Sequence, residues 1–423
     1  MLTLNLIRTE TEFVKQGLQK KHFKEITIVD EILAIDEKRR ALQQQNDAVL
    51  AQQNNAAKQI GMLMKEGKKA EAESLKLQVS DLKKQSELLS TDLATTEQQQ
   101  HDLLVKLPNM PHSSVPNGKT PEENTVVYQV DNIPVLPEDA LPHWDLAAKY
   151  NLIDFELGVK LTGAGFPVYK NKGAKLQRSL ITYFLDKATE AGYIEIMPPL
   201  MVNAESGYGT GQLPDKEGQM YHAVADDFYL IPTAEVPVTN IYRDVIVKED
   251  EFPIKMTAYT PCFRREAGSY GKDVRGLNRL HQFDKVEIVQ IEHPEKSYET
   301  LETMVKHVEN LLIELELPYR ILRLCGGDMS FASALTFDFE VWSAAQKRWL
   351  EVSSTSCFES FQTNRMKCRF KDKNGKMQLA HSLNGSALAL PRIVASLLEN
   401  NQTTDGIKIP KALQKYFGAE IIN

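Results

Sequence analysis

The sequence predicts an α+β protein in which an antiparallel two-helix coiled-coil arm precedes a larger body with a mainly antiparallel sheet flanked by helices. The chain has 423 residues, which is too many for one ordinary core. Residues 28–107 contain no proline and carry apolar residues seven positions apart. After residue 118, short runs that alternate apolar with polar residues are interspersed with helical patterns.

The arm is predicted from two heptad series. The first series is Ile28, Ile35, Leu42, Val49, Ala56 and Leu63. The second is Leu75, Leu82, Leu89, Thr96 and Leu103, accompanied by Val79, Leu93 and Leu107 and interrupted at Ser86 and Gln100. Gly67 lies between the two series, so we predict a helical hairpin over about residues 28–105. Each helix would be on the order of 50 Å long.

The arm alone is compatible with two uses. A two-helix rod is most often a dimerisation coiled coil, but it can also project to reach a large partner. Its basic residues could meet phosphates or form an ordinary solvated face. These residues are Lys38, Arg39, Arg40, Lys58, Lys65, Lys68, Lys69, Lys76, Lys83 and Lys84.

The chain divides at a proline-rich segment. We predict an N-terminal domain at residues 1–107, a linker at 108–118 and a second domain at 119–423. In the second domain, residues 171–192 and 298–317 have helical periodicity, and the runs ALTFDFEVW and RWLEVSS alternate as strands do.

Composition excludes several classes of protein. The net charge of −7 leaves no broad basic field, so contacts with nucleic acid would come from local patches. The four cysteines form no C-x-x-C pair, which argues against structural zinc and a disulfide framework. There is no signal peptide and no apolar run of about 20 residues, so we expect a cytoplasmic protein without a membrane span.

The densest chemical pattern is FRREAGSYGKDVRGLNRLHQFDKVE at residues 263–287. If it forms a hairpin, Arg264 and Glu266 share a face of the first strand, and Phe283, Lys285 and Glu287 share a face of the second. Arginine grips phosphate or carboxylate, and an aromatic ring can stack on a base, which suggests a ligand floor. An exposed, salt-bridged hairpin is the alternative.

The loop between the two strands is rich in glycine and basic residues. Its glycines are Gly268, Gly271 and Gly276, and its basic residues are Lys272, Arg275 and Arg279. We expect this loop to fold over a polyphosphate or the end of a nucleic acid. The sequence contains no phosphate loop of the G-x-x-x-x-G-K type and no G-x-G-x-x-G motif after a strand.

With these motifs in place, the chain resembles the bacterial type of seryl-tRNA synthetase. Residues 263–287 resemble motif 2 of class II aminoacyl-tRNA synthetases, GYIEIMPPLMV resembles motif 1, and NGSALALPRIVASLLEN resembles motif 3. TGQLP, PTAEVP and EVSSTS follow the family order, and the helical hairpin matches the family's tRNA-binding arm. The similarity covers essentially the whole chain and implies a class II catalytic domain.

The resemblance implies a role for particular residues. The catalytic residues would be Arg264, Glu266 and Arg392. ATP would be bound by Arg264, Arg265, Glu266, Leu280, Phe283, Glu351, Val352, Ser353, Ser354 and Arg392. Serine would be bound by Thr233, Ala234, Glu235, Arg264, Glu287, Asn384 and Ser386. Glu351 and Ser354 would hold Mg²⁺ with ATP, and no zinc is implied.

The resemblance also implies partners and an activity. The chain would join L-serine to the 3′ end of tRNA(Ser), and to tRNA(Sec) where a cell has it, as a cytoplasmic homodimer with Pro199 at its interface. Five positions depart from the family pattern and touch loop geometry. They are Ser330, Cys357, Ser360, Ala387 and Pro391.

Two other functions compete with tRNA charging. A class II relative could activate an amino acid and load it onto a carrier protein, but such relatives lack the long arm and use zinc. A non-catalytic tRNA-binding scaffold is the other alternative, although retention of Arg264, Glu266, Glu351 and Arg392 argues against it.

Overall fold

The computed structural model describes residues 1–215, 218–266 and 275–423. Contacts divide the chain into two compact units, one formed by residues 1–19 and 23–108, and the other by residues 20–22 and 109–423.

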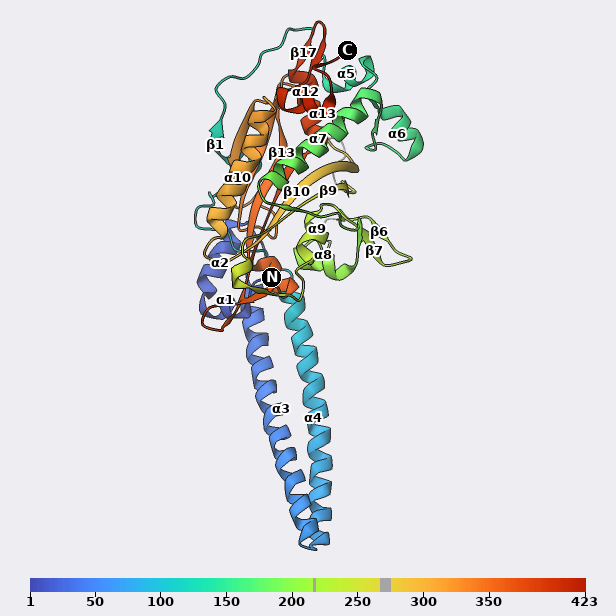
Figure 1. Cartoon of the computed structure of the whole chain (residues 1–423). Helices are drawn as coiled ribbons and strands as arrows, with labels where there is room; N and C mark the ends of the chain where they lie inside the picture. The colour runs from blue at the N-terminus through green and yellow to red at the C-terminus, as the bar shows by residue number, and fades with distance from the viewer. Residues whose placement is uncertain (216–217, 267–274) are drawn as a thin grey trace. The chain divides into compact units, whose positions relative to one another are not determined.

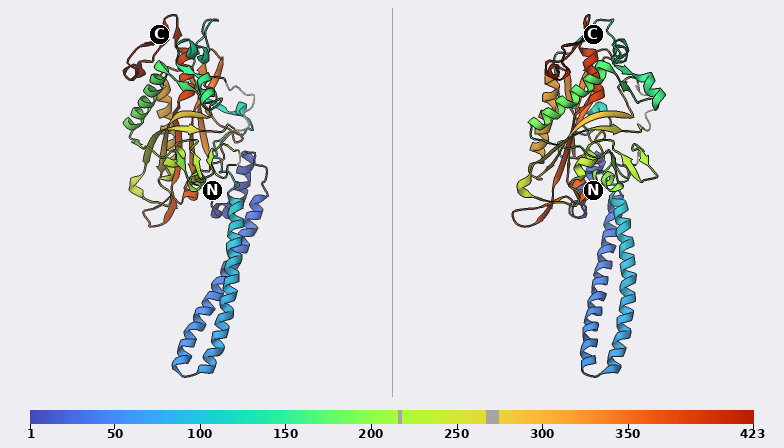
Figure 2. Two further views of the ribbon diagram at one scale, coloured as in Figure 1. Left: turned by 90° about the vertical axis from the view of Figure 1, so that its right-hand side faces the viewer. Right: turned by 45° about the vertical axis from the view of Figure 1, so that its right-hand side comes forward.

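The first unit is entirely helical. Its helices are α1 (Leu4–Thr9), α2 (Thr11–Lys20, of which Lys20 belongs to the second unit), α3 (Ile28–Lys65) and α4 (Lys69–Leu104). Helices α3 and α4 run side by side and are joined by a short turn at one end (Figures 1 and 2). The turn contains Gly67, whose φ of +77° favours glycine. The predicted hairpin is therefore confirmed, with helix bounds within a few residues of those expected.

The seam of the hairpin follows the heptad pattern, with polar exceptions that are paired. All of the first-series positions are buried or half-buried. Ser86, an interruption of the second stripe, is buried and donates to Asn46 Oδ1 at 2.9 Å. Gln100, the other interruption, is also buried, and its side chain donates to Asp36 Oδ1 at 3.3 Å. The interruptions in the apolar stripe are thus hydrogen-bonded partners across the two helices.

The second unit is built on a mainly antiparallel sheet, as predicted. Among the described residues its strand order is β1-β11-β12-β13-β16-β10-β9-β4, and only the β4–β9 pair is parallel. The bounds are β1 (Thr125–Gln129), β4 (Ile194–Glu195), β9 (Ile254–Phe263), β10 (Gln282–Glu292), β11 (Tyr319–Arg323), β12 (Leu335–Ser343), β13 (Arg348–Glu359) and β16 (His381–Ala389). Strand β16 pairs with both β10 and β13, and this places side chains of the three strands together.

Helices cover this sheet (Figure 1). The helices of the second unit are α5 (His143–Lys149), α6 (Phe155–Leu161), α7 (Asn171–Glu190), α8 (Ala204–Thr210), α9 (Glu235–Asn240), α10 (Ser297–Glu314), α11 (Phe361–Met366), α12 (Leu390–Asn400) and α13 (Lys411–Phe417). Residues of α7, α10 and α12 share one hydrophobic core with Val286 and Ile288 of β10. These two side chains of β10 therefore point into the body. Helices α7 and α10 match the two helices predicted from periodicity.

Smaller strands border the main sheet. They are β2 (Ile153–Asp154) with β3 (Val168–Tyr169), β5 (Met201–Val202) with β7 (Phe228–Leu230) and β6 (His222–Ala223), β8 (Ile246–Lys248) with β14 (Arg369–Lys371) and β15 (Met377–Leu379), and β17 (Gln402–Thr403) with β18 (Gly406–Lys408) and β19 (Ile421–Ile422). Residues 193–202 form only the short strands β4 and β5 on either side of Pro198 and Pro199, because proline donates no ladder hydrogen bond.

Candidate active site

A buried ion pair lies near the middle of the main sheet. On β10, Lys285 Nζ is 2.6 Å from Glu287 Oε2, and the two side chains are 7% and 2% exposed. Glu287 lies opposite Ser386 on β16. The hairpin β9–β10 is therefore not the exposed, salt-bridged hairpin that was the alternative, because Lys285 and Glu287 lie inside the molecule, where burying a charge is costly unless it is paired.

The segment before α9 brings further polar groups to this ion pair. The Thr233 hydroxyl accepts from Lys285 Nζ at 2.9 Å and lies 3.4 Å from Glu287 Oε2. It also accepts from the Glu235 backbone N–H, so it caps the turn, although the helix N-cap position itself is Ala234. Ala234 is fully buried. The predicted serine-binding residues Thr233, Glu235 and Glu287 therefore lie together.

Glu235 is a buried carboxylate with several partners. Its Oε1 accepts from Gln362 Nε2 at 2.6 Å, and Asn384 also hydrogen-bonds to it. Burial, followed by repulsion from Glu287, raises the pKa of Glu235 to about 7, while the bonds from Gln362 and Asn384 and the charge of Lys285 oppose this rise. A cation brought to this carboxylate would relieve both effects.

Arg264 lies at the edge of the polar cluster, beside an aromatic ring. Its guanidinium carbon is 5.2 Å from the centre of the Phe283 ring, and its Nε donates to the Pro232 carbonyl at 3.3 Å. The sequence pattern placed Arg264 and Glu266 on one face of a strand, and this was wrong. Strand β9 ends at Phe263, and Glu266 has a φ of +49°, which lies outside the extended region of a regular strand.

The glycine-rich loop is only partly described. Gly268, Gly271 and Lys272 lie outside the described residues. Where the description resumes, the Arg275 guanidinium lies over the ring of Trp144 at 4.6 Å. Arg279 forms an ion pair with Glu266 at 3.0 Å. In this structure both arginines have partners within the protein.

The residues expected to meet ATP on β13 share a face because of a bulge. Glu340 pairs with Glu351 while Phe339 pairs with Ser353, so β13 has one extra residue, Val352. The bulge turns Glu351 and Ser354 to the same face although they are three positions apart. Val352 is buried in the core, and the Ser353 hydroxyl donates to the Ser386 carbonyl at 2.6 Å.

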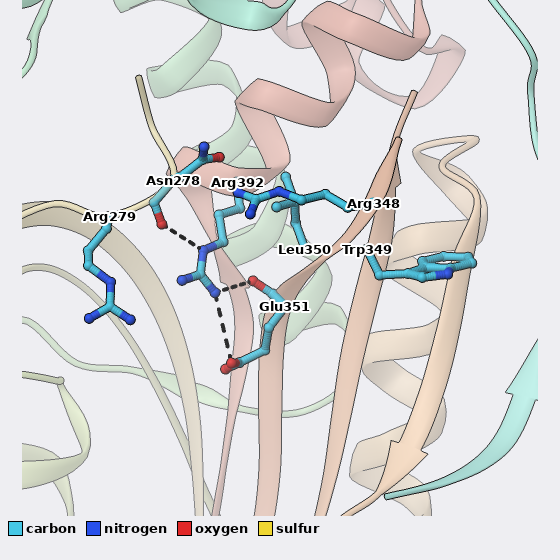
Figure 3. A pocket seen from close by; sticks show the side chains of 7 residues that line it. All are labelled: Asn278, Arg279, Arg348, Trp349, Leu350, Glu351 and Arg392. Carbon is cyan, nitrogen blue, oxygen red and sulfur yellow. Dashed lines mark hydrogen bonds and ion pairs between the residues drawn. The ribbon is translucent and has the colours of Figure 1, made fainter. Parts of the chain in front are cut away.

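Arg392 closes the pocket beside β13. Pro391 lies in the first turn of α12, and the following Arg392 donates from Nε to the Asn278 carbonyl at 3.1 Å. Its Nη1 donates to the Glu351 carbonyl at 2.7 Å and lies 3.8 Å from the Glu351 carboxylate (Figure 3). The pocket measures about 210 Å³ and is lined by Asn278, Arg279, Arg348, Trp349, Leu350, Glu351 and Arg392.

The other predicted positions lie in varied surroundings. The backbone N–H of Arg265 donates to the Gln219 carbonyl at 2.8 Å, and Leu280 is buried in the core. Pro199 is exposed. Among the departures from the family pattern, Cys357 and Ala387 are fully buried, the Ser330 carbonyl accepts from Lys21 Nζ at 2.8 Å, and Ser360 precedes α11 as its N-cap.

Comparison with known proteins gives the family. Residues 1–111 match the family model described as the seryl-tRNA synthetase N-terminal domain, and residues 221–401 match the tRNA synthetase class II core domain of the G, H, P, S and T types. A serine–tRNA ligase of Salinibacter ruber is 50% identical over 99% of this chain and 98% of its own length. The chain belongs to the seryl-tRNA synthetase family.

Solved structures of the family agree with the fold. The seryl-tRNA synthetase of Pyrococcus horikoshii, solved in complex with ATP, has a TM-score of 0.93 at 32% identity and covers 100% of this chain and 99% of its own. The cytoplasmic serine–tRNA ligase of Naegleria fowleri, solved with AMP, has a TM-score of 0.88 at 25% identity, with 100% and 99% coverage. The predicted family and fold class are both confirmed.

Three residues that contact the predicted site residues were not themselves predicted. Lys285 was noted in the sequence, but alternation alone did not show that it pairs with Glu287. Gln362 approaches Glu235 from α11, and no local signal marks it. Asp338 on β12 lies opposite Ser354 and hydrogen-bonds to it. Burial and the Glu351 charge raise the pKa of Asp338. In FDFE, Asp338 and Glu340 lie two positions apart and so share a face of a strand, and this spacing was the signal that could have identified Asp338.

Two negative findings concern the described residues. None of the helices in the described ranges is long and apolar enough to cross a membrane. Nor do three or more His, Cys, Asp or Glu side chains gather there into a group that could hold a metal ion.

Proposed function

We propose that this chain activates L-serine with ATP and transfers the serine to the 3′ end of tRNA(Ser). In the first step a serine carboxylate oxygen attacks the α-phosphorus of ATP, the bond to the β-phosphate breaks, and diphosphate leaves. In the second step the 2′- or 3′-hydroxyl of the terminal tRNA nucleotide attacks the carbonyl carbon of seryl-adenylate, and AMP leaves. The observation that carries the proposal is the buried polar cluster of Thr233, Glu235 and Glu287 beside Arg264.

The buried cluster suits the amino acid. Glu235 would take the ammonium group, with Thr233 beside it. Glu287 and Ser386, which lie opposite each other on neighbouring strands, would bond the substrate hydroxyl. Alanine would leave these buried polar groups without a partner, so a site of this kind discriminates strongly against it. Asn384, which hydrogen-bonds to Glu235, would keep that carboxylate in place.

The cationic side chains suit the nucleotide. Arg264 would bind the α-phosphate and the serine carboxylate, where negative charge builds up in the transition state. Phe283 would stack on the adenine through the ring face that Arg264 does not cover, or after Arg264 has moved. Arg392 would reach the γ-phosphate from the first turn of α12. The Pyrococcus horikoshii enzyme was solved in complex with ATP, which supports ATP as the nucleotide.

The oxygen donors on β12 and β13 fit Mg²⁺ that arrives with ATP. Glu351 carries a half-exposed carboxylate, and Ser354 and Asp338 share its face of the sheet. Hard oxygen ligands are the ligands that Mg²⁺ prefers, and it commonly uses few protein groups together with phosphates. Bound there, the ion would neutralise charge on the phosphates. The side chains of Glu351 and Ser354 would hold it, and Asp338 would orient Ser354 through their hydrogen bond.

The remaining proposals concern assembly. The helical arm would bind tRNA(Ser) by shape, because a rod can reach along a stem that a globular body cannot. A homodimer is supported by exposed apolar residues around Pro199, where Ile194 is 64% and Met197 is 90% exposed. We keep domain limits of 1–107, 108–118 and 119–423 as part of the proposal, and we place the enzyme in the cytoplasm, where tRNA is used.

The direct test is transfer of labelled serine to total bacterial tRNA by the purified chain with ATP and Mg²⁺. The matched variants are Arg264→Ala and, as a surface control, Arg369→Ala on β14, whose side chain is exposed. We expect charging by the wild type and the control, and a loss of about 100-fold or more in Arg264→Ala. Formation of adenylate without charged tRNA would instead favour the carrier-loading relative, and absence of adenylate would favour the non-catalytic scaffold.

A further inference from the structure

A buried carboxylate lies at the other end of the helix that carries Arg392. Glu399 of α12 is fully buried, and so is His143 at the start of α5. Glu399 Oε1 accepts from His143 Nδ1 at 2.7 Å, from the His143 backbone N–H at 3.0 Å and from Gln346 Nε2 at 3.1 Å. The Ser343 hydroxyl donates to its other oxygen. Burial acts to raise the pKa of Glu399, but the hydrogen bonds from His143 and Ser343 outweigh it and lower the pKa.

His143 connects this carboxylate to the end of the motif 2 loop. Its Nε2 accepts the backbone N–H of Leu277 at 2.9 Å. A nitrogen that accepts carries no proton, so Nδ1 holds the ring proton that is donated to Glu399. The approach is close, because a Cβ at Gly276 would lie 2.2 Å from His143 Nε2, and the φ of Gly276 is +67°. This position therefore requires glycine.

A second connection runs in parallel through Gln346. Its Nε2 donates to Glu399, and its Oε1 accepts from Asn278 Nδ2 at 3.0 Å. Asn278 in turn accepts the Nε of Arg392 through its backbone carbonyl at 3.1 Å. Residues 277 and 278 are thus bonded to α12 from two ends, by Arg392 directly and by Glu399 through His143 and Gln346.

We infer that His143 and Gln346, held by Glu399, are positioning residues for the nucleotide side of the active site. They fix the backbone of residues 276–278, and that backbone fixes the guanidinium of Arg392 over the pocket of Figure 3. None of the three needs to touch ATP. The inference rests on the proposed function, since it assigns the pocket to ATP. The serine-binding cluster shares none of these hydrogen bonds, so the two substrates are expected to respond differently.

Two His143 substitutions separate the two bonds of the ring. The amide of His143→Asn can replace Nδ1 but does not reach Leu277, whereas the amide of His143→Gln lies near the position of Nε2 and can still accept. In serine-dependent exchange of diphosphate into ATP, we expect His143→Asn to raise the KM for ATP about tenfold, with the KM for serine changed less than twofold. We expect His143→Gln to recover most of this loss.

Gln346→Ala keeps the test informative if His143→Asn does not fold, because Gln346 is only half-buried. It should also raise the KM for ATP selectively, and ATP should raise its melting temperature less than that of the wild type. The inference is overturned if every variant that folds, His143→Asn or Gln346→Ala, keeps the wild-type KM for ATP. It is also overturned if the KM values for ATP and serine rise equally. Absence of exchange in the wild type would instead refute the proposed function, and the ATP-induced melting shift would then test the positioning by itself.

Discussion

The helical arm and the central sheet both bury polar side chains, but they do so in opposite ways. In the seam of the arm, Asn46 and Ser86 are neutral and bonded to each other, and the buried Asp36 carboxylate is balanced by Arg8 at 2.6 Å. At the middle of the sheet, Lys285 and Glu287 are charged, and a second carboxylate, Glu235, lies close enough to feel the charge of Glu287. A neutral pair costs little to bury, whereas two carboxylates facing one ammonium group leave an excess of negative charge.

The difference indicates what each arrangement is for. A polar pair within an apolar helical seam favours one register over others. A surplus buried carboxylate does nothing for the fold, because a hydrophobic replacement is often as stable or more so. The surplus at Glu235 is therefore best explained by a cation that arrives with the substrate. The arm uses buried polarity to define its own structure, and the sheet uses it to receive a ligand.

The largest expected effect separates the two regions completely. Deleting residues 30–104 should reduce tRNA charging by on the order of 100-fold or more, the equivalent of about 3 kcal/mol of lost contacts. Serine-dependent exchange of diphosphate into ATP should remain near the wild-type rate, because the catalytic residues lie in the second unit. A milder control replaces residues 50–82 by a short glycine-serine turn and keeps Asn46 with Ser86. If the full deletion lost exchange as well, the arm would be needed for the body to fold, and the domain limits would be wrong.

The same contrast explains how much the sequence could predict. The arm was predictable because its partners lie on two adjacent helices and share one repeat, so even the interruptions at Ser86 and Gln100 fall in the seam. For the sheet, only its mainly antiparallel type was predictable, and the pairing of its strands was not. Glu287 and Ser386 are about 100 positions apart, and no periodicity joins them. Alternation placed Glu287 on the predicted ligand floor, but only the family resemblance joined Ser386 to it.

Local irregularities set the limit of the pattern argument. Alternation failed at Glu266, because the chain leaves the strand at Arg264 and takes a positive φ two residues later. It would also have separated Glu351 from Ser354, which the bulge at Val352 brings to one face. A single inserted residue reverses the parity of a strand, and nothing in a run such as WLEVSST reveals it.

Breaking the buried ion pair should cost more stability than removing a neutral hydrogen bond from the seam of the arm. Lys285→Met leaves Glu287 and Glu235 without their shared cation, and we expect a loss of about 3 kcal/mol in the free energy of unfolding. The double variant Lys285→Met with Glu287→Leu should recover part of the loss. Denaturant unfolding of the full chain measures both. If the single variant lost less than the double, the ion pair would not be coupled as its 2.6 Å separation implies.

Glu235 gives a pH dependence with a definite sign. Burial and Glu287 raise the pKa of Glu235 to about 7, so its carboxylate ionises between about pH 6 and 8. The serine ammonium binds the ionised form, and the KM for serine should fall about tenfold over this range. Stability responds in the opposite sense. The folded chain holds the proton that an unfolded glutamate loses near its ordinary pKa of 4.5, so stability falls as pH rises toward about 7.

The variant Glu235→Gln tests this assignment. It should raise the KM for serine about tenfold at pH 8 and make that KM nearly independent of pH, with little change in the KM for ATP. Its pH profile of stability should also be flatter between about pH 4.5 and 7. A variant that kept the wild-type slope of KM against pH would assign the titration to another group.

The smallest expected effect lies in the arm. Ser86→Ala removes the bond to Asn46 Oδ1, and we expect a loss of about 1 kcal/mol that is confined to α3 and α4. Amide hydrogen exchange around residues 42–50 and 82–90 should therefore be about fivefold faster, while the amides of β10 and β16 are unchanged. Ser80→Ala, at an exposed position of the same helix, is the matched control. A loss as large as that of Lys285→Met would mean that the neutral pair contributes as much as the charged one, and the distinction between register in the arm and ligand binding in the sheet would no longer hold.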